Sequence, residues 1–337
     1  MDDTWPRMDT IRPRMDTIGP LLHPANCRLA GVMQVFSRAE LLAQGMSPHD
    51  IGAAVAVGRL TRVGRAAYIV GEVVDEASRH LALIRACSGD TLAMESAAII
   101  HDLPVAALPR AVQVIVPGDG TSWQRSTRTS RSAPLPLDQE TVVDGHRLTT
   151  IARTVVDLAR FRPGRAAVIT WEAARWRANT AHRDEQLQQD IAEVMTTLQG
   201  RNGMGAARSM AQFASSASQS PMESVSRWNM RALGLPAPVQ QFDVVDEYGA
   251  VVGTPDFGWP EYGVVGEYDG EGKYQELASP GQSPADVFWK EKRRQERIED
   301  LGWIVVRWNK QEIRRPELMK TKIERAFRRA QGRRPAA

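Results

Sequence analysis

Cysteine is nearly absent from this sequence: Cys27 and Cys87 are the only two in 337 residues. Two cysteines cannot form the set of disulfides that holds small secreted domains together, and they are too few for a zinc site built from thiolates. The scarcity therefore excludes a disulfide framework and a cysteine-based zinc cluster. It is typical of a protein in a reducing compartment.

Long apolar runs are also missing. The sequence is 42% hydrophobic and 25% charged, as soluble globular proteins are, and none of its apolar runs approaches the roughly 20 residues of a membrane span. Charges and prolines interrupt the apolar runs of the first thirty residues, so no signal-peptide core is recognisable. We therefore expect a cytoplasmic protein that does not enter a membrane.

The chain has little excess of either charge overall, with a formal net charge of +3, but the charges are unevenly distributed. Residues 290–334 contain sixteen lysines and arginines against seven acids. Such a basic segment favours a polyanionic partner, although a basic helix is often only a solvated surface.

A length of 337 residues predicts two or three domains, because one hydrophobic core rarely grows this large. The segment PRMDTI occurs at 6–11 and again at 13–18, and its prolines oppose a helix. We expect five segments: a disordered tail (1–30), a helix-turn-helix with a wing (31–75), a mixed α/β middle region (76–200), a linker rich in glycine and serine (201–217) and a C-terminal α/β sandwich (218–334).

Two capping signals define the first of these domains. Ser37 followed by Glu40 predicts a helix over 38–44, and Ser47 followed by Pro48 predicts a second helix over 49–57. The apolar residues between 60 and 70 then predict a tight hairpin. Helix, turn, helix and wing is the order of a winged helix-turn-helix.

The middle region and the C-terminal region show mixed patterns. In the middle region we expect helices over 76–88, 91–100, 151–160, 165–178 and 184–199, and a strand over 112–116. In the C-terminal region we expect a helix from 220 to 233, strands near 240–245, 251–257 and 263–269, a helix over 285–301, a strand over 303–308 and a basic final helix. Helices that alternate with strands in this order predict an α/β sandwich.

Carboxylates occupy positions where buried strands are expected. Alternate residues of a strand share a face, so Val265, Glu267 and Asp269 are expected to point the same way. Asp256 reaches the same end of the sheet if its strand pairs antiparallel through the turn at 260–263. Two carboxylates about 4 Å apart repel by roughly 4 kcal/mol at an effective dielectric constant near 20. A divalent cation, Mg²⁺ or Mn²⁺, would remove that cost and suits phosphodiester hydrolysis. Lys273 and Lys292 are the candidates for stabilising the developing negative charge.

Residues 218 to the end resemble the very-short-patch-repair-like branch of the PD-(D/E)XK nuclease superfamily. The segments that carry the resemblance are SPMES at 220–224, PD at 255–256, GEYDG at 266–270 with KY at 273–274, and WKEKR at 289–293 leading to LGWIVVR at 301–307. The resemblance implies a restriction-endonuclease-like fold, with Asp256 and Glu267 as metal ligands and Glu223 as an accessory acid. Asp269 stands two residues after Glu267, where the superfamily most often has lysine, so the catalytic lysine is unassigned.

Each of these acids also has a simpler interpretation. Glu223 lies three residues after Ser220 and suits a capping box. Asp256 follows a proline and suits the start of a strand, while Asp269 before Gly270 suits a turn.

The segment from Phe36 to Gly71 resembles the winged helix of AbiEi-family antitoxins, and RLTTIARTVVDLARF at 147–161 resembles the central region of that family. The resemblance implies that Ser47, His49 and Asp50 lie near the DNA major groove and that three arginines contact phosphates, namely Arg59, Arg62 and Arg65. The second helix carries AAVAV and few side chains that can read bases, so we expect contacts mainly to the DNA backbone. A winged helix that docks a protein is the alternative.

Two functions remain open at this point. The first is a Mg²⁺- or Mn²⁺-dependent endonuclease acting on double-stranded DNA, in which the winged helix delivers the nuclease-like domain. The second is an AbiEi-like antitoxin and autorepressor with a catalytically inactive nuclease fold and a cognate toxin as its partner.

Overall fold

The computed structural model describes residues 35–64, 67–71, 75–87, 89–270 and 284–332. Helices and strands occur along the whole of this part of the chain, so the expected mixed α/β class is confirmed. The chain divides into two compact units, which meet in the sequence between Ala214 and Ser215. We call them the N-terminal unit and the C-terminal unit. The predicted tail at 1–30 lies outside the described residues, as do Arg65 and Lys273.

No helix among the described residues combines the length and the apolar composition that crossing a membrane requires.

The first two helices begin with reciprocal capping boxes. At α2 (Arg38–Ala43) the Ser37 hydroxyl accepts a hydrogen bond from the Glu40 amide, and the Glu40 carboxylate accepts one from the Ser37 amide at 2.7 Å. Ser47 and Asp50 form the same arrangement at α3 (Pro48–Ala56). A three-stranded antiparallel sheet in the order β1-β3-β2 accompanies them, formed by β1 (Val35–Ser37), β2 (Leu60–Arg62) and β3 (Ala67–Val70). The expected hairpin is therefore present, and β1 is an addition.

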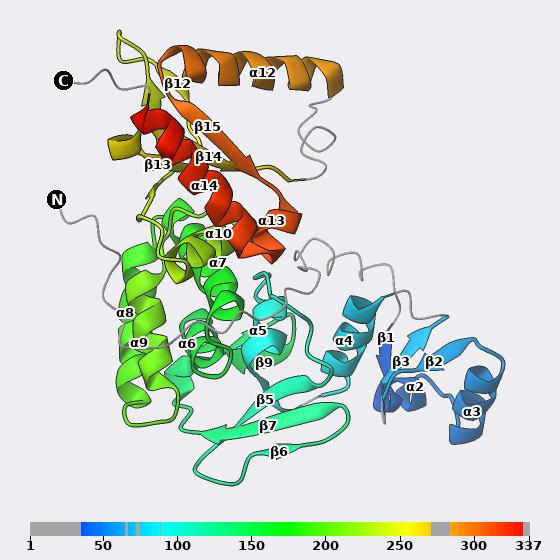
Figure 1. The fold of residues 1–337 in the computed structure, drawn as a ribbon. Coiled ribbons are helices and arrows are strands. Elements are labelled where there is room, and N and C mark those ends of the chain that lie inside the picture. Colours follow the sequence, from blue (N-terminus) through cyan, green and yellow to red (C-terminus); the bar gives the residue numbers. More distant parts are fainter. Residues whose placement is uncertain (1–34, 65–66, 72–74, 88, 271–283, 333–337) are drawn as a thin grey trace. The chain divides into compact units, whose positions relative to one another are not determined.

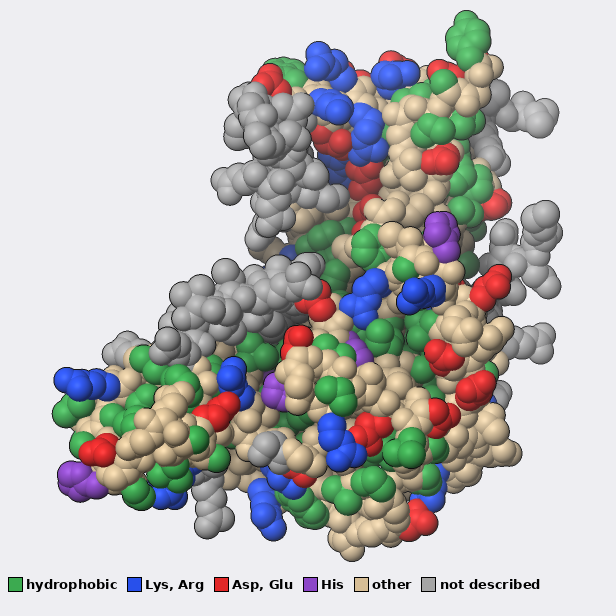
Figure 2. Space-filling view, turned by 180° about the vertical axis from the view of Figure 1, so that it is seen from behind, with side chains coloured by type: hydrophobic (Ala, Val, Ile, Leu, Met, Phe, Trp, Pro, Cys, Tyr) green, Lys and Arg blue, Asp and Glu red, His purple; other side chains and the backbone are tan. Residues whose placement is uncertain are grey.

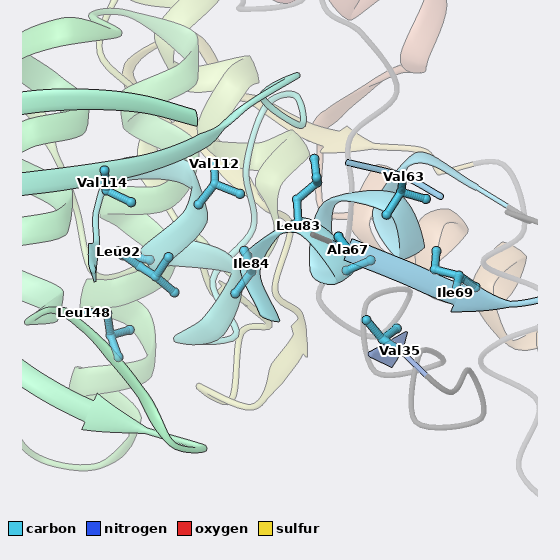
Figure 3. Packing of buried hydrophobic residues seen from close by; sticks show 12 residues of the cluster. Val35, Val63, Ala67, Ile69, Leu83, Ile84, Leu92, Val112, Val114 and Leu148 are labelled. Atoms are coloured by element: carbon cyan, nitrogen blue, oxygen red, sulfur yellow. The ribbon is translucent and has the colours of Figure 1, made fainter. Parts of the chain in front are cut away.

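A continuous apolar cluster connects these first elements to the residues that follow. Figure 3 shows Val63 and Ala67 of the first segment next to Leu83, and Ile84 leading on to Leu92. Leu83 and Ile84 belong to α4 (Glu76–Arg85), which is amphipathic and buries one face here. The segments expected as separate domains, 31–75 and 76–200, thus share one core within the N-terminal unit.

A six-stranded sheet in the order β6-β7-β5-β4-β9-β8 forms the rest of the strand content of this unit. Its strands are β4 (Thr91–Leu92), β5 (Val112–Pro117), β6 (Trp123–Gln124), β7 (Arg128–Ala133), β8 (Glu140–Val143) and β9 (His146–Thr149). We expected only β5, and we expected a helix over 91–100, which begins instead at Met94 as α5 (Met94–Ile100). The other strands are short and polar, for instance RTSRSA in β7, so they lack the apolar alternation that identifies a strand.

The helices α6 (Ile151–Phe161), α7 (Arg165–Thr180) and α8 (Asp184–Thr197) follow as expected, and Thr150 caps α6. A buried ion pair stabilises α6 from within: Arg153, which is fully buried, donates to Asp157 at 2.8 Å and to the carbonyl oxygen of Pro134 at 2.7 Å.

The segment expected as a linker, 201–217, contains a helix, α9 (Met204–Phe213). Met204, Ala207, Met210 and Phe213 recur at helical spacing and are buried, so the apolar face decided the conformation although glycines and serines surround it.

The C-terminal unit is built on a four-stranded sheet in the order β10-β13-β14-β15. These strands are β10 (Val239–Gln240), β13 (Phe257–Trp259), β14 (Val264–Tyr268) and β15 (Ile304–Trp308), and a separate hairpin is formed by β11 (Val244–Val245) and β12 (Val251–Gly253). β13 and β14 are antiparallel, as expected, and β14 and β15 are parallel. The two strands expected at 240–245 and 251–257 are thus each divided into shorter pieces.

Helices cover both faces of this sheet (Figure 1). Val265 of β14 and Val305 of β15 pack with Ile298 of α12 (Pro284–Asp300) on one face. On the opposite face Phe257 stacks on Trp308, and the Trp308 indole donates to Ser226 of α10 (Pro221–Ala232) at 2.8 Å. Two further helices follow, α13 (Lys310–Arg314) and α14 (Pro316–Gln331), and α14 contacts β14 and β15.

Candidate functional site

Asp256 and Glu267 lie side by side at one end of the four-stranded sheet. Phe257 pairs with Gly266 across β13 and β14, so Asp256 precedes and Glu267 follows this pair on neighbouring strands. The Asp256 Oδ2 atom accepts a hydrogen bond of 2.8 Å from the amide of Tyr268. Glu267 is buried, with 7% of its surface exposed. Val265, two residues earlier, faces α12, so Glu267 faces the same helix. Both acids therefore lie at the same end of the sheet, and their roles as metal ligands stay predictions.

Two arginines neutralise Glu267. Arg307 donates to Glu267 Oε2 through Nε at 3.0 Å and lies within 2.9 Å of it through Nη2, while Arg294 Nη2 contacts Oε1 at 2.5 Å. Arg307 reaches Glu267 because the two residues are direct partners in the parallel β14–β15 ladder. Arg294 reaches it from α12. Both carboxylate oxygens of Glu267 therefore accept from guanidinium groups.

Glu291 of α12 completes a group of four charged side chains, which we call the Arg–Glu quartet: Glu267, Glu291, Arg294 and Arg307. Arg294 donates to Glu291 through Nε at 2.8 Å and through Nη2 at 2.6 Å, and Arg307 also donates to Glu291 Oε1. Burial raises the pKa of Glu291, but the hydrogen bond from Arg294 and the charges of both arginines outweigh it, so the pKa lies below its ordinary value. The hydrogen bond to Glu291 in turn raises the pKa of Arg294. Glu291 and Arg294 therefore stabilise each other's charged form.

Glu223 is linked to the Asp256 end of the sheet through Gln241. Its Oε2 accepts from the Gln219 amide at 2.9 Å and from the Gln241 side-chain amide at 3.0 Å, and the Gln241 backbone amide donates to the Asp256 carbonyl oxygen. The Ser220 hydroxyl caps α10 by accepting from the Glu223 amide, as the simpler interpretation expected, yet the Glu223 carboxylate binds Gln219 and Gln241 instead of closing a capping box.

The other residues predicted for this site are Asp269, Lys292 and Lys273. Asp269 extends the β14–β15 pairing, since its amide donates to the Trp308 carbonyl oxygen at 2.8 Å. Lys292 is half exposed; its ammonium group lies 4.0 Å from Glu296 and 5.1 Å from the centre of the Trp289 ring, and both of these partners are on α12. Lys273 falls outside the described residues.

A metal ion would meet a mixed set of groups here. Two carboxylates on one face of neighbouring strands suit the chemistry of Mg²⁺ or Mn²⁺. However, Glu267 already accepts from both arginines, and the described residues contain no group of three or more His, Cys, Asp or Glu side chains able to hold a metal. The described side chains therefore do not form a ready-made cation site, and a cation at Glu267 would have to replace a guanidinium contact.

The predicted DNA-contacting residues lie on α3 and the hairpin after it. His49, Arg59 and Arg62 are exposed, and Arg62 Nε donates to the Gly64 carbonyl oxygen at 3.1 Å. Ser47 is exposed too, but its hydroxyl donates to Asp50 at 2.7 Å and accepts from the Asp50 amide, so the capping box engages both side chains. The arginines on the hairpin are thus the residues best placed to reach a phosphate.

Sequence reasoning missed three members of the quartet: Glu291, Arg294 and Arg307. Glu291 and Arg294 lie three residues apart, a spacing that brings side chains together on a helix. Arg307 is the single charged residue in the otherwise apolar segment WIVVRW. A charge inside an apolar strand is the signal that could have found it.

No protein-family model matches the chain. Two curated proteins are similar to it, each 31% identical over 189 residues: "Uncharacterized protein MT2308" of Mycobacterium tuberculosis (strain CDC 1551 / Oshkosh) and "Uncharacterized protein Rv2248" of Mycobacterium tuberculosis (strain ATCC 25618 / H37Rv). The similarity spans 56% of this chain and 64% of each relative, so the chain covers less than two thirds of their length.

Proposed function

We propose that this chain is a cytoplasmic DNA-binding protein whose C-terminal unit is an endonuclease-like module that hydrolyses phosphodiester bonds. The observation that carries the proposal is the position of Asp256 and Glu267 on one face of adjacent strands, with Arg294 and Arg307 in contact with Glu267. Carboxylates beside arginines suit a phosphodiester, because the arginines bind the phosphate and the acids take part in its hydrolysis. The resemblance to the very-short-patch-repair-like nucleases supports the same function.

The N-terminal unit supplies DNA binding in this proposal. The order of α2, α3, β2 and β3 supports a winged helix-turn-helix of the AbiEi type, with exposed Arg59 and Arg62 on the hairpin. These arginines contact phosphates, so binding depends on salt more than on base sequence.

Asp256 and Glu267 are the residues that would hold Mg²⁺ or Mn²⁺, if the ion replaced a guanidinium contact of Glu267; such an ion would supply an activated water molecule. Glu223 and Asp269 assist by orienting the groups around Asp256. Arg294 and Arg307 neutralise the negative charge of the phosphate and orient it.

The arginine contacts of the Glu267 carboxylate favour a second function. Because both oxygens of that carboxylate accept from arginines, the C-terminal unit also suits a protein that binds DNA without cleaving it. Such a protein would be an autorepressor of the AbiEi antitoxin type, with a cognate toxin as its partner.

The two functions are separated by incubating the full-length protein with supercoiled plasmid and with linear duplex, in the presence of Mg²⁺, Mn²⁺ or EDTA. Cleavage that requires the metal and is lost in both Asp256→Ala and Glu267→Gln supports the nuclease. Glu299→Gln is the matched control, since Glu299 is an exposed acid of α12 that accepts a hydrogen bond from Gln295 at 2.8 Å, and this variant should cleave as wild type does. Shifted DNA without cleavage supports the repressor, and the absence of both cleavage and binding contradicts the proposal.

A further inference from the structure

The Arg–Glu quartet has one buried acid and one accessible acid. The Glu267 side chain is 10% exposed, whereas that of Glu291 is 28% exposed, close to the values of 26% and 25% for Arg294 and Arg307. Glu291, Arg294 and Arg307 thus lie at the surface above Glu267. Glu291 contacts both guanidinium groups at once, so its position is one at which a ligand from solvent could bind both of them.

The contacts of Glu291 match those that a phosphate group makes. One oxygen, Oε1, accepts from Nη2 of both arginines, and the other, Oε2, accepts from Arg294 Nε at 2.8 Å. The two arginines thus share Oε1 of Glu291, and Arg294 binds Oε2 as well. Arginines bind carboxylates and phosphates alike through such paired contacts. A phosphodiester carries two non-bridging oxygens and one negative charge, as an ionised carboxylate does.

The charge of the quartet is also balanced for such an exchange. Two arginines face two carboxylates, so the group is neutral as it stands. If a phosphodiester replaces Glu291, the two arginines still face two negative charges, and the Glu291 carboxylate moves into water. Glu291 is on the half-exposed side of α12, where a rotamer change releases it without moving the helix.

Charged side chains of both signs surround the quartet on α12. The exposed basic residues are Lys290, Lys292, Arg293 and Arg297, and the exposed acidic residues are Asp286, Glu296, Glu299 and Asp300. In Figure 2, basic and acidic side chains lie next to one another on the upper part of the molecule, where the C-terminal unit is drawn. The case for an anion site therefore rests on the contacts of Arg294 and Arg307 themselves and not on the net charge of the helix.

We propose that Arg294 and Arg307 form a binding site for a phosphodiester of nucleic acid, and that Glu291 is a built-in occupant of this site that the phosphate displaces. The inference rests on the proposed function for the identity of the ligand as nucleic acid. It goes beyond that function because it makes Glu291 an internal competitor that lowers DNA affinity, independently of any metal ion.

Charge removal at Glu291 tests this inference. Glu291→Gln keeps the size of the side chain but lowers its competition for the guanidinium groups, so we expect about tenfold tighter binding of a 12-base-pair duplex in EDTA, measured by fluorescence anisotropy. Arg307→Gln should weaken binding by a similar factor. Glu296→Gln removes one negative charge from an exposed site on the same helix and is the matched control, with an expected change below about twofold. Unfolded protein cannot bind more tightly, so a gain in Glu291→Gln is not a folding artefact.

A second probe, inorganic phosphate followed by ³¹P NMR, separates this inference from the proposed function. Line broadening that is stronger in Glu291→Gln than in wild type, and lost in Arg307→Gln, supports the site even if the wild type fails to bind or cleave DNA. Wild-type DNA binding with Glu291→Gln no tighter than Glu296→Gln would overturn the inference and leave the proposed function intact. Equal broadening by phosphate in all variants would overturn it as well.

Discussion

The contact between Glu267 and Arg307 offers a quantitative test of the site geometry. The perturbation is a double-mutant cycle of Glu267→Gln, Arg307→Gln and both together, in which glutamine keeps the approximate size and some hydrogen bonding of each side chain. The two residues pair directly across β14 and β15, with the arginine nitrogens 3.0 and 2.9 Å from Glu267 Oε2. The cycle isolates this one interaction from the effect of each substitution alone.

The expected coupling follows from the burial of the pair. Two charges 4 Å apart at an effective dielectric constant near 20 attract by about 4 kcal/mol, which is an upper bound. Arg307 is one quarter exposed, and each partner keeps a second ion pair, Glu267 with Arg294 and Arg307 with Glu291. Screening and these remaining contacts reduce the coupling to about 1–2 kcal/mol.

Hydrogen exchange measured by mass spectrometry on peptides from β14 and β15 gives the free energy of opening of these strands. The amide of Asp269, which donates to the Trp308 carbonyl oxygen, reports directly on this ladder. A parallel cycle on Lys292 and Glu296, a half-exposed pair at 4.0 Å, is the control and should show less than about 0.5 kcal/mol. If the Glu267–Arg307 cycle is additive to within the same limit, the quartet does not stabilise the sheet and the argument from its geometry is refuted.

Three further predictions concern packing and charge elsewhere. A methyl group at Gly266 would lie 2.7 Å from ring atoms of the buried Trp308. Gly266→Ala should therefore destabilise the C-terminal unit by about 1–3 kcal/mol, measured by urea unfolding followed by fluorescence. Unchanged stability would contradict this packing. Burial lowers the pKa of His80 to about 4 from an ordinary value of 6.5, so the unfolded state binds a proton at a higher pH than the folded state does. The contribution of His80 to the free energy of unfolding should be constant above about pH 6.5 and fall by about 3 kcal/mol toward pH 4. His80→Gln should remove this dependence on pH in thermal melts. Arg153→Ala should cost about 3–5 kcal/mol, because the Pro134 carbonyl oxygen and Gln139 Oε1 lose a buried donor and Asp157 keeps only its ion pair with Arg160. Arg147→Gln at an exposed ion pair should cost less than about 1 kcal/mol in the same unfolding assay, and equal costs would contradict the burial.

Short-range signals identified much of the secondary structure. The helix starts at Ser37, Ser47 and Thr150 were predictable because a capping side chain binds an amide only three residues away, and nothing distant takes part. The short polar strands of the six-stranded sheet were not predictable, because pairing with neighbouring strands holds them extended and their own residues do not favour a strand.

In the candidate site, the sequence by itself determined that Glu267 shares a face with Val265, since the alternation of a strand is local, and that Asp256 reaches the same end through a short turn. Only the tertiary structure decided what meets Glu267. Arg307 is 40 residues away in the sequence and becomes its neighbour through the parallel register of β14 and β15, and Arg294 and Glu291 arrive because α12 packs on that face. Contacts between distant segments depend on register and packing, which local patterns do not encode, and so the two arginines at Glu267 were not predicted.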